Sequence, residues 1–352
     1  MRAVLKGTGM FVPELVVDNH RLSRIMDTSD EWIQQRTGIV TRHYAGPHQA
    51  TSDLAVPAAA QAVAEAGLER DQIDYVVFAT MTPDYYFPGA GPVFARKFGL
   101  AGVPCLDIRQ QCAGFVWGLQ LADAVIRAGQ YRNVLLIGAE VHAGFMPWDW
   151  DLLFGKSRRE PTASEYEWNT RFRDRTVLFG DGAGAFVLSA VDDDETEAGI
   201  EAVTVHSDGV HWDKMWVDGV GSAYRPWIDR RMIESGAVVP IVQGRDVFKV
   251  AVTLMPDVTQ KILAQHGYTL DDLRLVIMHQ ANLRINEACQ KRLGLPDERV
   301  FNNIQRYGNT TAATLPIAFH EARRERGLEA GDLVAFVALG SGLNWGAALY
   351  RC

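Results

Sequence analysis

The chain has 352 residues, of which 47% are hydrophobic and 22% are charged, a composition typical of a globular protein with a sizeable core. Its formal net charge of −8 argues against a nucleic-acid-binding protein, because such proteins need a basic face for phosphates. The longest apolar run, Leu333–Leu339, is too short for a membrane-spanning helix, so we expect no membrane span.

The N-terminus and the cysteines indicate a protein of a reducing compartment, the cytoplasm. Lys6 and Gly7 interrupt the apolar residues of the first segment, so no signal-peptide core is predicted. None of the cysteines forms a CxxC pair, which argues against a zinc ribbon and a thioredoxin-like motif. We therefore expect no bound metal. The cysteines are Cys105, Cys112, Cys289 and Cys352.

Two parts of the chain repeat each other. Residues 67–84 align without a gap on residues 267–284, an offset of 200, and both patterns predict a helix that ends at a glycine, followed by a strand. A second pair, 103–138 and 300–335, aligns at an offset of 197 and predicts strand, turn, helix and strand. In this second register Cys112 lies opposite Asn309.

The repeats predict two similar α/β halves, 1–195 and 196–352, related by a pseudo-twofold axis. The acidic segment Asp192–Gly199 is the expected connector between them. The continuous apolar runs Val134–Gly138 and Leu333–Leu339 are typical of parallel strands covered on both faces. We expect the helix after Cys112 to be buried, because it is apolar on nearly every side.

Cys112 is the candidate nucleophile. A helix N-terminus carries partial positive charge and free N–H groups, which favour a thiolate and can stabilise an oxyanion. The alternative is an inert, buried thiol. The position of Cys112 opposite Asn309 favours the reactive interpretation.

Two further residues complete the candidate site. His279 follows the predicted strand Leu273–Met278, at the strand end where α/β proteins usually bind ligands; the alternative is a structural histidine. Asn309 could be only a helix N-cap, but its alignment with Cys112 favours a place in the site. The segment Gly180–Gly184 lacks the lysine and the strand–helix context of a phosphate loop, so it predicts a tight turn into a strand.

Several motifs together make the sequence similar to one known family. The chain resembles the β-ketoacyl-acyl carrier protein synthase III family, the initiating condensing enzymes of fatty-acid synthesis in the thiolase superfamily. The resemblance covers nearly the whole chain and implies a thiolase-like fold, in which two pseudo-duplicated α/β halves form a layered αβαβα body. The motifs are Asp27–Ile39, Cys112–Phe115, Phe179–Gly184, His279–Arg284 and Tyr307–Thr310.

The resemblance implies a catalytic triad of Cys112, His279 and Asn309. An acyl-CoA acylates the cysteine, and malonyl-acyl carrier protein then binds and loses CO2. The enolate, held by the histidine and the asparagine, attacks the acyl-cysteine to give a β-ketoacyl product. The resemblance implies no metal or other cofactor, because coenzyme A thioesters enter as substrates.

The resemblance also assigns binding residues. The backbone N–H groups of Cys112 and Ser341 would form the oxyanion hole. Phe87 would enter the acyl pocket of the partner subunit in a homodimer. The entrance for coenzyme A would be lined by Trp32, Arg36, Arg175 and Asn282.

Basic residues predict a docking patch for the acidic carrier protein, since complementary charge sets encounter rate and orientation. Arg284, Lys291 and Arg292 share one face of the helix predicted after His279. Arg245 and Lys249, one helical turn apart, could join them. The alternative is an ordinary solvated face.

The chain departs from compact family members in two places. Leu343-Asn344-Trp345 stands where they carry glycines followed by Phe, and residues 145–172 form an aromatic-rich insertion. The insertion would cover the acyl tunnel, enlarge the dimer contact, or only pack on its own aromatic residues. Both departures point away from an acetyl starter.

Three alternative functions can be compared with the residues present. One is a related Cys-His-Asn condensing enzyme of specialised metabolism that uses a long, aromatic or otherwise unusual acyl starter. A degradative thiolase would need a second cysteine in the C-terminal glycine loop, where Ser341 and Leu343 flank Gly342. A non-catalytic partner subunit would typically lack the nucleophile, whereas the whole triad is present.

Overall fold

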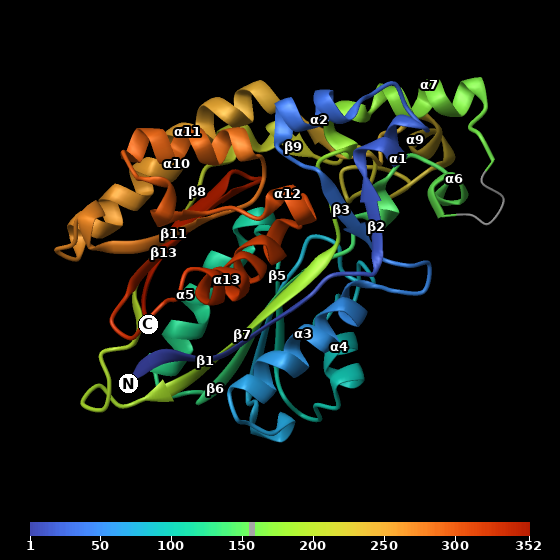
Figure 1. Ribbon diagram of the computed structural model, residues 1–352. Coiled ribbons are helices and arrows are strands. Elements are labelled where there is room, and N and C mark those ends of the chain that lie inside the picture. The colour runs from blue at the N-terminus through green and yellow to red at the C-terminus, as the bar shows by residue number, and fades with distance from the viewer. Residues whose placement is uncertain (155–158) are drawn as a thin grey trace.

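The computed structural model describes residues 1–154 and 159–352. Two five-stranded sheets form its centre (Figure 1). The first sheet has the order β1 (Arg2–Phe11), β7 (Gly182–Val191), β6 (Asn133–Glu140), β4 (Tyr75–Ala79) and β5 (Cys105–Ile108). The second has the order β12 (Val300–Phe301), β11 (Leu273–Met278), β13 (Leu333–Gly340), β14 (Asn344–Arg351) and β8 (Gly199–Ser207).

The two sheets follow the same path. In the first, β5, β4 and β6 are parallel, and β7 and β1 continue the sheet antiparallel. In the second, β12, β11 and β13 are parallel, and β14 and β8 are antiparallel. One sheet draws its strands from residues 2–191 and the other from residues 199–351. The exact division of the chain after residue 195 stays a prediction.

Helices fill three layers around the sheets (Figure 1). Between the sheets lie α5 and α13, whose apolar residues pack with strands of both sheets in one buried cluster. Outside the first sheet are α3 and α4, and outside the second are α10 and α11. The bounds of these helices are Thr51–Glu65 (α3), Gly91–Phe98 (α4), Gly114–Arg127 (α5), Gly244–Gln265 (α10), Leu283–Leu293 (α11) and Thr314–Glu325 (α13).

The all-apolar character of α5 is explained by its central place. Phe115, Val116, Leu119, Ala122 and Ile126 are all nearly fully buried, as expected for a helix covered on every side. Its start is therefore fixed at the middle of the molecule, where Cys112 precedes it.

The register predicted between the two central helices is wrong. Each helix is preceded by a one-turn 3-10 helix, η2 (Gln111–Ala113) and η7 (Thr311–Ala313), so the equivalent of Cys112 is Ala312 and not Asn309. The difference arises because the second half contains an additional short helix, α12 (Ile304–Tyr307), between β12 and η7. This helix lengthens the connection after β12, whereas one offset of 200 aligns β4 and β6 with β11 and β13 and also η2 with η7.

The remaining elements form a cap beside the sheets. A hairpin of β2 and β3, the helices α1, α2 and α6, and residues around them share a separate buried cluster, and α7 and α8 follow along the chain. Their bounds are Leu15–Asp18 (β2), Asn19–Ser23 (α1), Asp30–Thr37 (α2), Thr41–Tyr44 (β3), Trp150–Phe154 (α6), Ala163–Arg171 (α7) and Arg173–Thr176 (α8). A long excursion adds η4 (Gly209–Lys214), β9 (Met215–Trp216), α9 (Arg230–Ser235) and β10 (Ile241–Val242).

The aromatic segment 145–172 packs on the cap. The rings of Trp148, Trp150 and Phe154 surround Tyr44, with centroids 6.3, 5.2 and 6.5 Å from the Tyr44 ring. Residues 155–158 of the segment lie outside the described residues. Its aromatic residues thus contact a strand more than 100 residues earlier rather than only one another.

Candidate active site

Cys112, His279 and Asn309 line one pocket of about 760 Å³. Cys112 comes from the turn before α5 and Asn309 from the loop before η7, while His279 directly follows β11. The wall of the pocket is mostly apolar. The structure therefore brings together residues from both halves of the chain at the contact between the two central helix starts.

The turn at Cys112 is held in an uncommon backbone conformation. Gln111 has a φ of +50°, which residues other than glycine rarely adopt. Gly340, the last residue of β13, lies directly against this turn: a Cβ there would stand 2.8 Å from the Cys112 nitrogen and 2.9 Å from the Ala113 nitrogen. Only glycine permits this approach. The neighbouring Ser341 lines the same pocket, and its oxyanion role stays a prediction.

The thiol of Cys112 is protonated at rest. Cys112 is partly exposed where it lines the pocket, and the rest of the residue is buried. This burial, followed by the negative charge of Glu140, raises the pKa of Cys112 to about 12. Burial thus opposes the thiolate expected at the helix start, and the reactive state of Cys112 stays a prediction.

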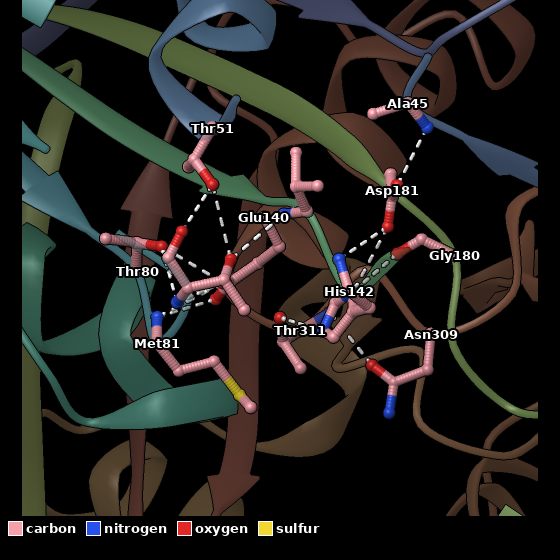
Figure 2. A network of polar contacts seen from close by, with 12 residues as sticks. Ala45, Thr51, Thr80, Met81, Glu140, His142, Gly180, Asp181, Asn309 and Thr311 are labelled. Carbon is pink, nitrogen blue, oxygen red and sulfur yellow. Dashed lines mark hydrogen bonds and ion pairs between the residues drawn. The ribbon is translucent and has the colours of Figure 1, made fainter. Parts of the chain in front are cut away.

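Glu140 owes its fixed place to five hydrogen bonds from the loop after β4 (Figure 2). Its carboxylate is fully buried and accepts from the backbone nitrogens of Met81 and Thr82 at 3.1 Å. It also accepts from the hydroxyls of Thr80 at 3.0 Å and Thr82 at 2.6 Å. A carboxylate with this many donors holds the ends of β4 and β6 together near Cys112.

His279 is neutral and offers a bare nitrogen. Its Nδ1 lies 2.7 Å from Thr314 Oγ1, and the Thr314 hydroxyl donates to the carbonyl of Thr311 at 2.8 Å. Because the hydroxyl has one proton, Nδ1–H must be the donor to Thr314, which leaves Nε2 as an acceptor. Nε2 is buried and has no partner among residues 1–154 and 159–352. Burial lowers the pKa of His279 to about 3.

Asn309 presents the donor end of its amide. Its backbone is bonded to the residues on either side of Phe179. The Asn309 nitrogen donates to the carbonyl of Leu178 at 2.8 Å, and the Gly180 nitrogen donates to the carbonyl of Asn309 at 3.1 Å. Its Oδ1 accepts the Thr311 N–H at 2.9 Å. Figure 2 shows the amide nitrogen on the opposite side from this contact. The oxygen thus serves the turn, and the NH2 group remains for a ligand.

Three of the four residues predicted at the coenzyme A entrance lie together. The Arg36 guanidinium stands 4.3 Å from the ring centroid of Trp32, and Asn282, which lines the pocket, donates to the Arg36 carbonyl at 2.9 Å. Arg175 instead stacks on a different ring, that of Phe172. Arg173 lies over Trp32 at 5.1 Å, so the geometry favours Arg173 as the fourth residue. The binding role stays a prediction.

The predicted carrier patch has two kinds of residue. Arg284 donates to the carbonyls of Gln34 and Gln35 and to Glu287, and thereby ties α11 to α2. Arg292 likewise ties α11 to α10 through Val252 and Asp257. The other three are exposed and form no ion pair with any described residue: Arg245, Lys249 and Lys291.

Phe87 stands out from the surface with 86% of its area exposed. Its neighbours Tyr85 and Tyr86 are exposed at 62% and 63%. Tyr86 lines the pocket of its own chain, and Phe87 does not. This apolar loop is therefore available for contact with another subunit.

The two sequence departures contribute little to the pocket. Leu343 is buried in the core, and Trp345 stacks on His206 with centroids 5.2 Å apart. Among the described residues of 145–172, Phe145 alone lines the pocket. The apolar wall comes instead from the excursion after β8 and from α10. It includes Met215, Trp216, Val217, Val220, Val238 and Met255.

Sequence reasoning missed the residues behind the triad. Thr314 and Thr311 could have been suspected from the run of threonines after Asn309. Glu140 and His142 carry no motif, because their partners are distant in sequence.

No helix in the part of the chain that the structure describes is long and apolar enough to cross a membrane. Within the same residues, no group of three or more His, Cys, Asp or Glu side chains is placed to hold a metal.

Comparison with known proteins identifies the family. The family model described as 3-oxoacyl-[acyl-carrier-protein (ACP)] synthase III matches residues 106–157, and its C-terminal counterpart matches residues 263–352. The beta-ketoacyl-[acyl-carrier-protein] synthase III of Novosphingobium aromaticivorans is 38% identical over 100% of this chain and 99% of its own. That of Roseiflexus castenholzii is 41% identical over 99% of this chain and 98% of its own. The chain belongs to the 3-oxoacyl-acyl carrier protein synthase III family.

Solved structures agree with this assignment. The synthase III of Aquifex aeolicus superimposes with a TM-score of 0.84 and 36% identity, covering 99% of this chain and 100% of that chain. The enzyme of Pseudomonas aeruginosa gives the same TM-score and identity over 100% and 98%. The predicted family, its thiolase-like α/β fold and a condensing acyltransferase are confirmed.

The protonation state of Cys112 can be measured by alkylation. Because its pKa is raised to about 12, the reactive thiolate fraction should increase about tenfold per pH unit between pH 7 and 9. We expect the rate of iodoacetamide modification of the Cys112 peptide, followed by mass spectrometry, to rise with that slope. A modification rate that stops rising below pH 8 would contradict the raised pKa of Cys112. It would indicate a preformed thiolate–imidazolium pair with His279.

Proposed function

We propose that Cys112 is acylated by an acyl-CoA and that the acyl group is then condensed with malonyl-acyl carrier protein to give a β-ketoacyl product. The observation that carries the proposal is the convergence of a buried thiol, a bare imidazole nitrogen and a free amide donor in one largely apolar pocket. Membership of the synthase III family supports the same reaction.

In the acylation step, His279 Nε2 takes the proton of the Cys112 thiol as the sulfur attacks the thioester carbonyl. A neutral imidazole suits this role, because its lone pair is free. The oxyanion accepts hydrogen bonds from the backbone N–H groups of Cys112 and Ser341. When the intermediate collapses, the C–S bond to coenzyme A breaks, and the leaving thiolate takes the proton from Nε2. His279 is neutral again.

In the condensation step, the C–C bond to the malonyl carboxylate breaks and its electron pair forms the enolate. Asn309 donates its NH2 group to the enolate oxygen. His279 takes one proton from solvent, favoured by the negative substrate, and becomes the second donor. The enolate carbon attacks the acyl-cysteine carbonyl, and the released Cys112 thiolate receives the proton of His279. The steps balance without a metal or a redox group.

A homodimer and a cytoplasmic location are part of the proposal. Tyr85, Tyr86 and Phe87 form an exposed apolar loop beside the pocket, which supports entry of Phe87 into the acyl pocket of a second copy. The four cysteines of the chain are free, which fits a reducing compartment.

The starter acyl group is proposed to be longer than acetyl. The support comes from the apolar wall built by β9, β10 and α10, since each buried methylene favours binding by about 0.8 kcal/mol. A longer starter is also compatible with a condensing enzyme of specialised metabolism. We expect hexanoyl-CoA or a longer chain to acylate Cys112 faster than acetyl-CoA, as followed by intact-protein mass. Acetyl-CoA outpacing every chain of six or more carbons would dispose of the proposal.

The two half-reactions should separate in Asn309→Asp. The substitution keeps the volume but places an acceptor, with negative charge at neutral pH, where the enolate develops. Losing one such donor costs about 10²- to 10³-fold in rate. We expect the variant to form the acyl-enzyme and to lose that much CO2 release from labelled malonyl-carrier protein.

Two controls make this test specific. Asn302→Asp, the same change on the other side of α12 and outside the pocket, should leave both steps intact. Cys112→Ala should form no adduct at all. If Asn309→Asp condensed near the wild-type rate, Asn309 would be only the partner of the Thr311 N–H.

The carrier patch is tested at its unpaired residues. Lys249→Glu should raise the KM for malonyl-carrier protein roughly fivefold at low salt and spare acylation by acyl-CoA. Lys261→Glu, the same change farther along α10, is the control. Arg284 is unsuitable, because its reversal would also break the tie to α2. An unchanged KM in both Lys249→Glu and Arg245→Glu would exclude the patch.

A further inference from the structure

We infer that His142 is a positioning residue of the active site, which acts through Thr311 on the orientation of the Asn309 amide. The inference rests on the proposed role of Asn309 as an enolate donor. It begins with Thr311, the first residue of η7, whose φ is +44°. A β-branched residue in this region is a strained outlier, and such strain persists only where its surroundings hold it.

Thr311 serves two catalytic side chains through its backbone. Its N–H donates to Asn309 Oδ1 at 2.9 Å and thereby turns the NH2 group toward the pocket. Its carbonyl accepts the Thr314 hydroxyl at 2.8 Å, and Thr314 in turn accepts Nδ1–H of His279. The conformation of this one residue therefore affects both the donor and the tautomer of the base.

His142 holds the side chain of Thr311. Its Nδ1 lies 2.8 Å from the carbonyl of Gly180, which can only accept, so Nδ1 carries the proton. Nε2 is then an acceptor and receives the Thr311 hydroxyl at 3.2 Å. The imidazole is fully buried and stacks on Phe179 with centroids 4.9 Å apart. The backbone N–H of His142 donates to Asp181 Oδ1 at 2.6 Å.

These contacts close a ring, part of which Figure 2 shows. His142 is anchored on the carbonyl of Gly180, and the nitrogen of Gly180 donates to the carbonyl of Asn309. Asn309 is joined to Thr311 by its side chain, and Thr311 is joined back to His142 by its hydroxyl. The residue that holds Thr311 is thus fixed to the same segment that holds Asn309, so the amide cannot turn independently.

The test compares the two ends of the His142–Thr311 contact. His142→Leu and Thr311→Val each remove the hydrogen bond while keeping an apolar filling. We expect each to lower the rate of condensation about tenfold, the worth of one buried hydrogen bond. The KM for malonyl-carrier protein should stay the same, and acyl-enzyme formation should stay within threefold of wild type.

Conservative variants at the same two positions should restore the rate of condensation. His142→Gln, which keeps an acceptor for Thr311, and Thr311→Ser, which keeps the hydroxyl, should recover most of the rate. The double variant His142→Leu/Thr311→Val should be no slower than His142→Leu alone, because the Thr311 contact is already lost in that single variant. His266→Leu, the same change at an exposed position, should affect neither step.

Two outcomes would overturn the inference: condensation by His142→Leu within twofold of wild type, or losses that multiply in the double variant. If His142→Leu did not fold, as judged by thermal melting, Thr311→Val and Thr311→Ser would decide alone. Failure of the proposed function is distinguishable, because the wild-type enzyme would then release no CO2 from malonyl-carrier protein; failure of the donor role of Asn309 would show as full condensation by Asn309→Asp.

Discussion

The active site depends on two close approaches between the halves of the molecule. Gly340, at the end of β13, touches the backbone nitrogens of Cys112 and Ala113, and Gly138 in β6 touches the carbonyl of Ala312. Each central strand thus meets the helix-start turn of the other half. Any side chain at either glycine would push the turns apart. Because the turns meet here, the thiol of Cys112 from one half and the amide of Asn309 from the other reach a single pocket.

Burial at this junction also shifts the pKa values of Cys112 and His279. It raises the pKa of the Cys112 thiol and lowers that of the His279 imidazole, which favours the neutral form of both groups. In the proposed acylation step, charge appears only as the thiol gives up its proton to Nε2 during attack. The fixed donors, above all the Asn309 amide, are oriented in advance by hydrogen bonds through Thr311. Preorganisation of this kind costs no rearrangement when the enolate forms.

Much of this arrangement could be predicted from the sequence. The repeat of residues 67–84 at 267–284 predicted the matching strands, and the continuous apolar runs predicted parallel strands covered on both faces, because these signals are local and periodic. The motifs around Cys112 and His279 predicted the family. The pairing of Cys112 with Asn309 was wrong, since the extra helix α12 changes the length of one connection.

Other features depend on contacts between distant residues and leave no local signal. Glu140 binds a loop some 60 residues earlier, and His142 meets Thr311 across the junction. Arg173 rather than Arg175 faces Trp32, because two residues along the short helix α8 turn a side chain to a different face. The aromatic residues after Phe145 pack on Tyr44, a contact that composition alone could not reveal.

The central claim is that Cys112 carries the acyl group that a decarboxylated malonyl unit attacks. Its most direct test uses the wild-type acyl-enzyme and malonyl-carrier protein labelled at the free carboxyl group, in a single turnover. The proposed reaction predicts that the adduct on the Cys112 peptide disappears and labelled CO2 is released in equal amounts and at equal rates. An adduct that persists on Cys112, or one that disappears without release of CO2, would contradict the claim.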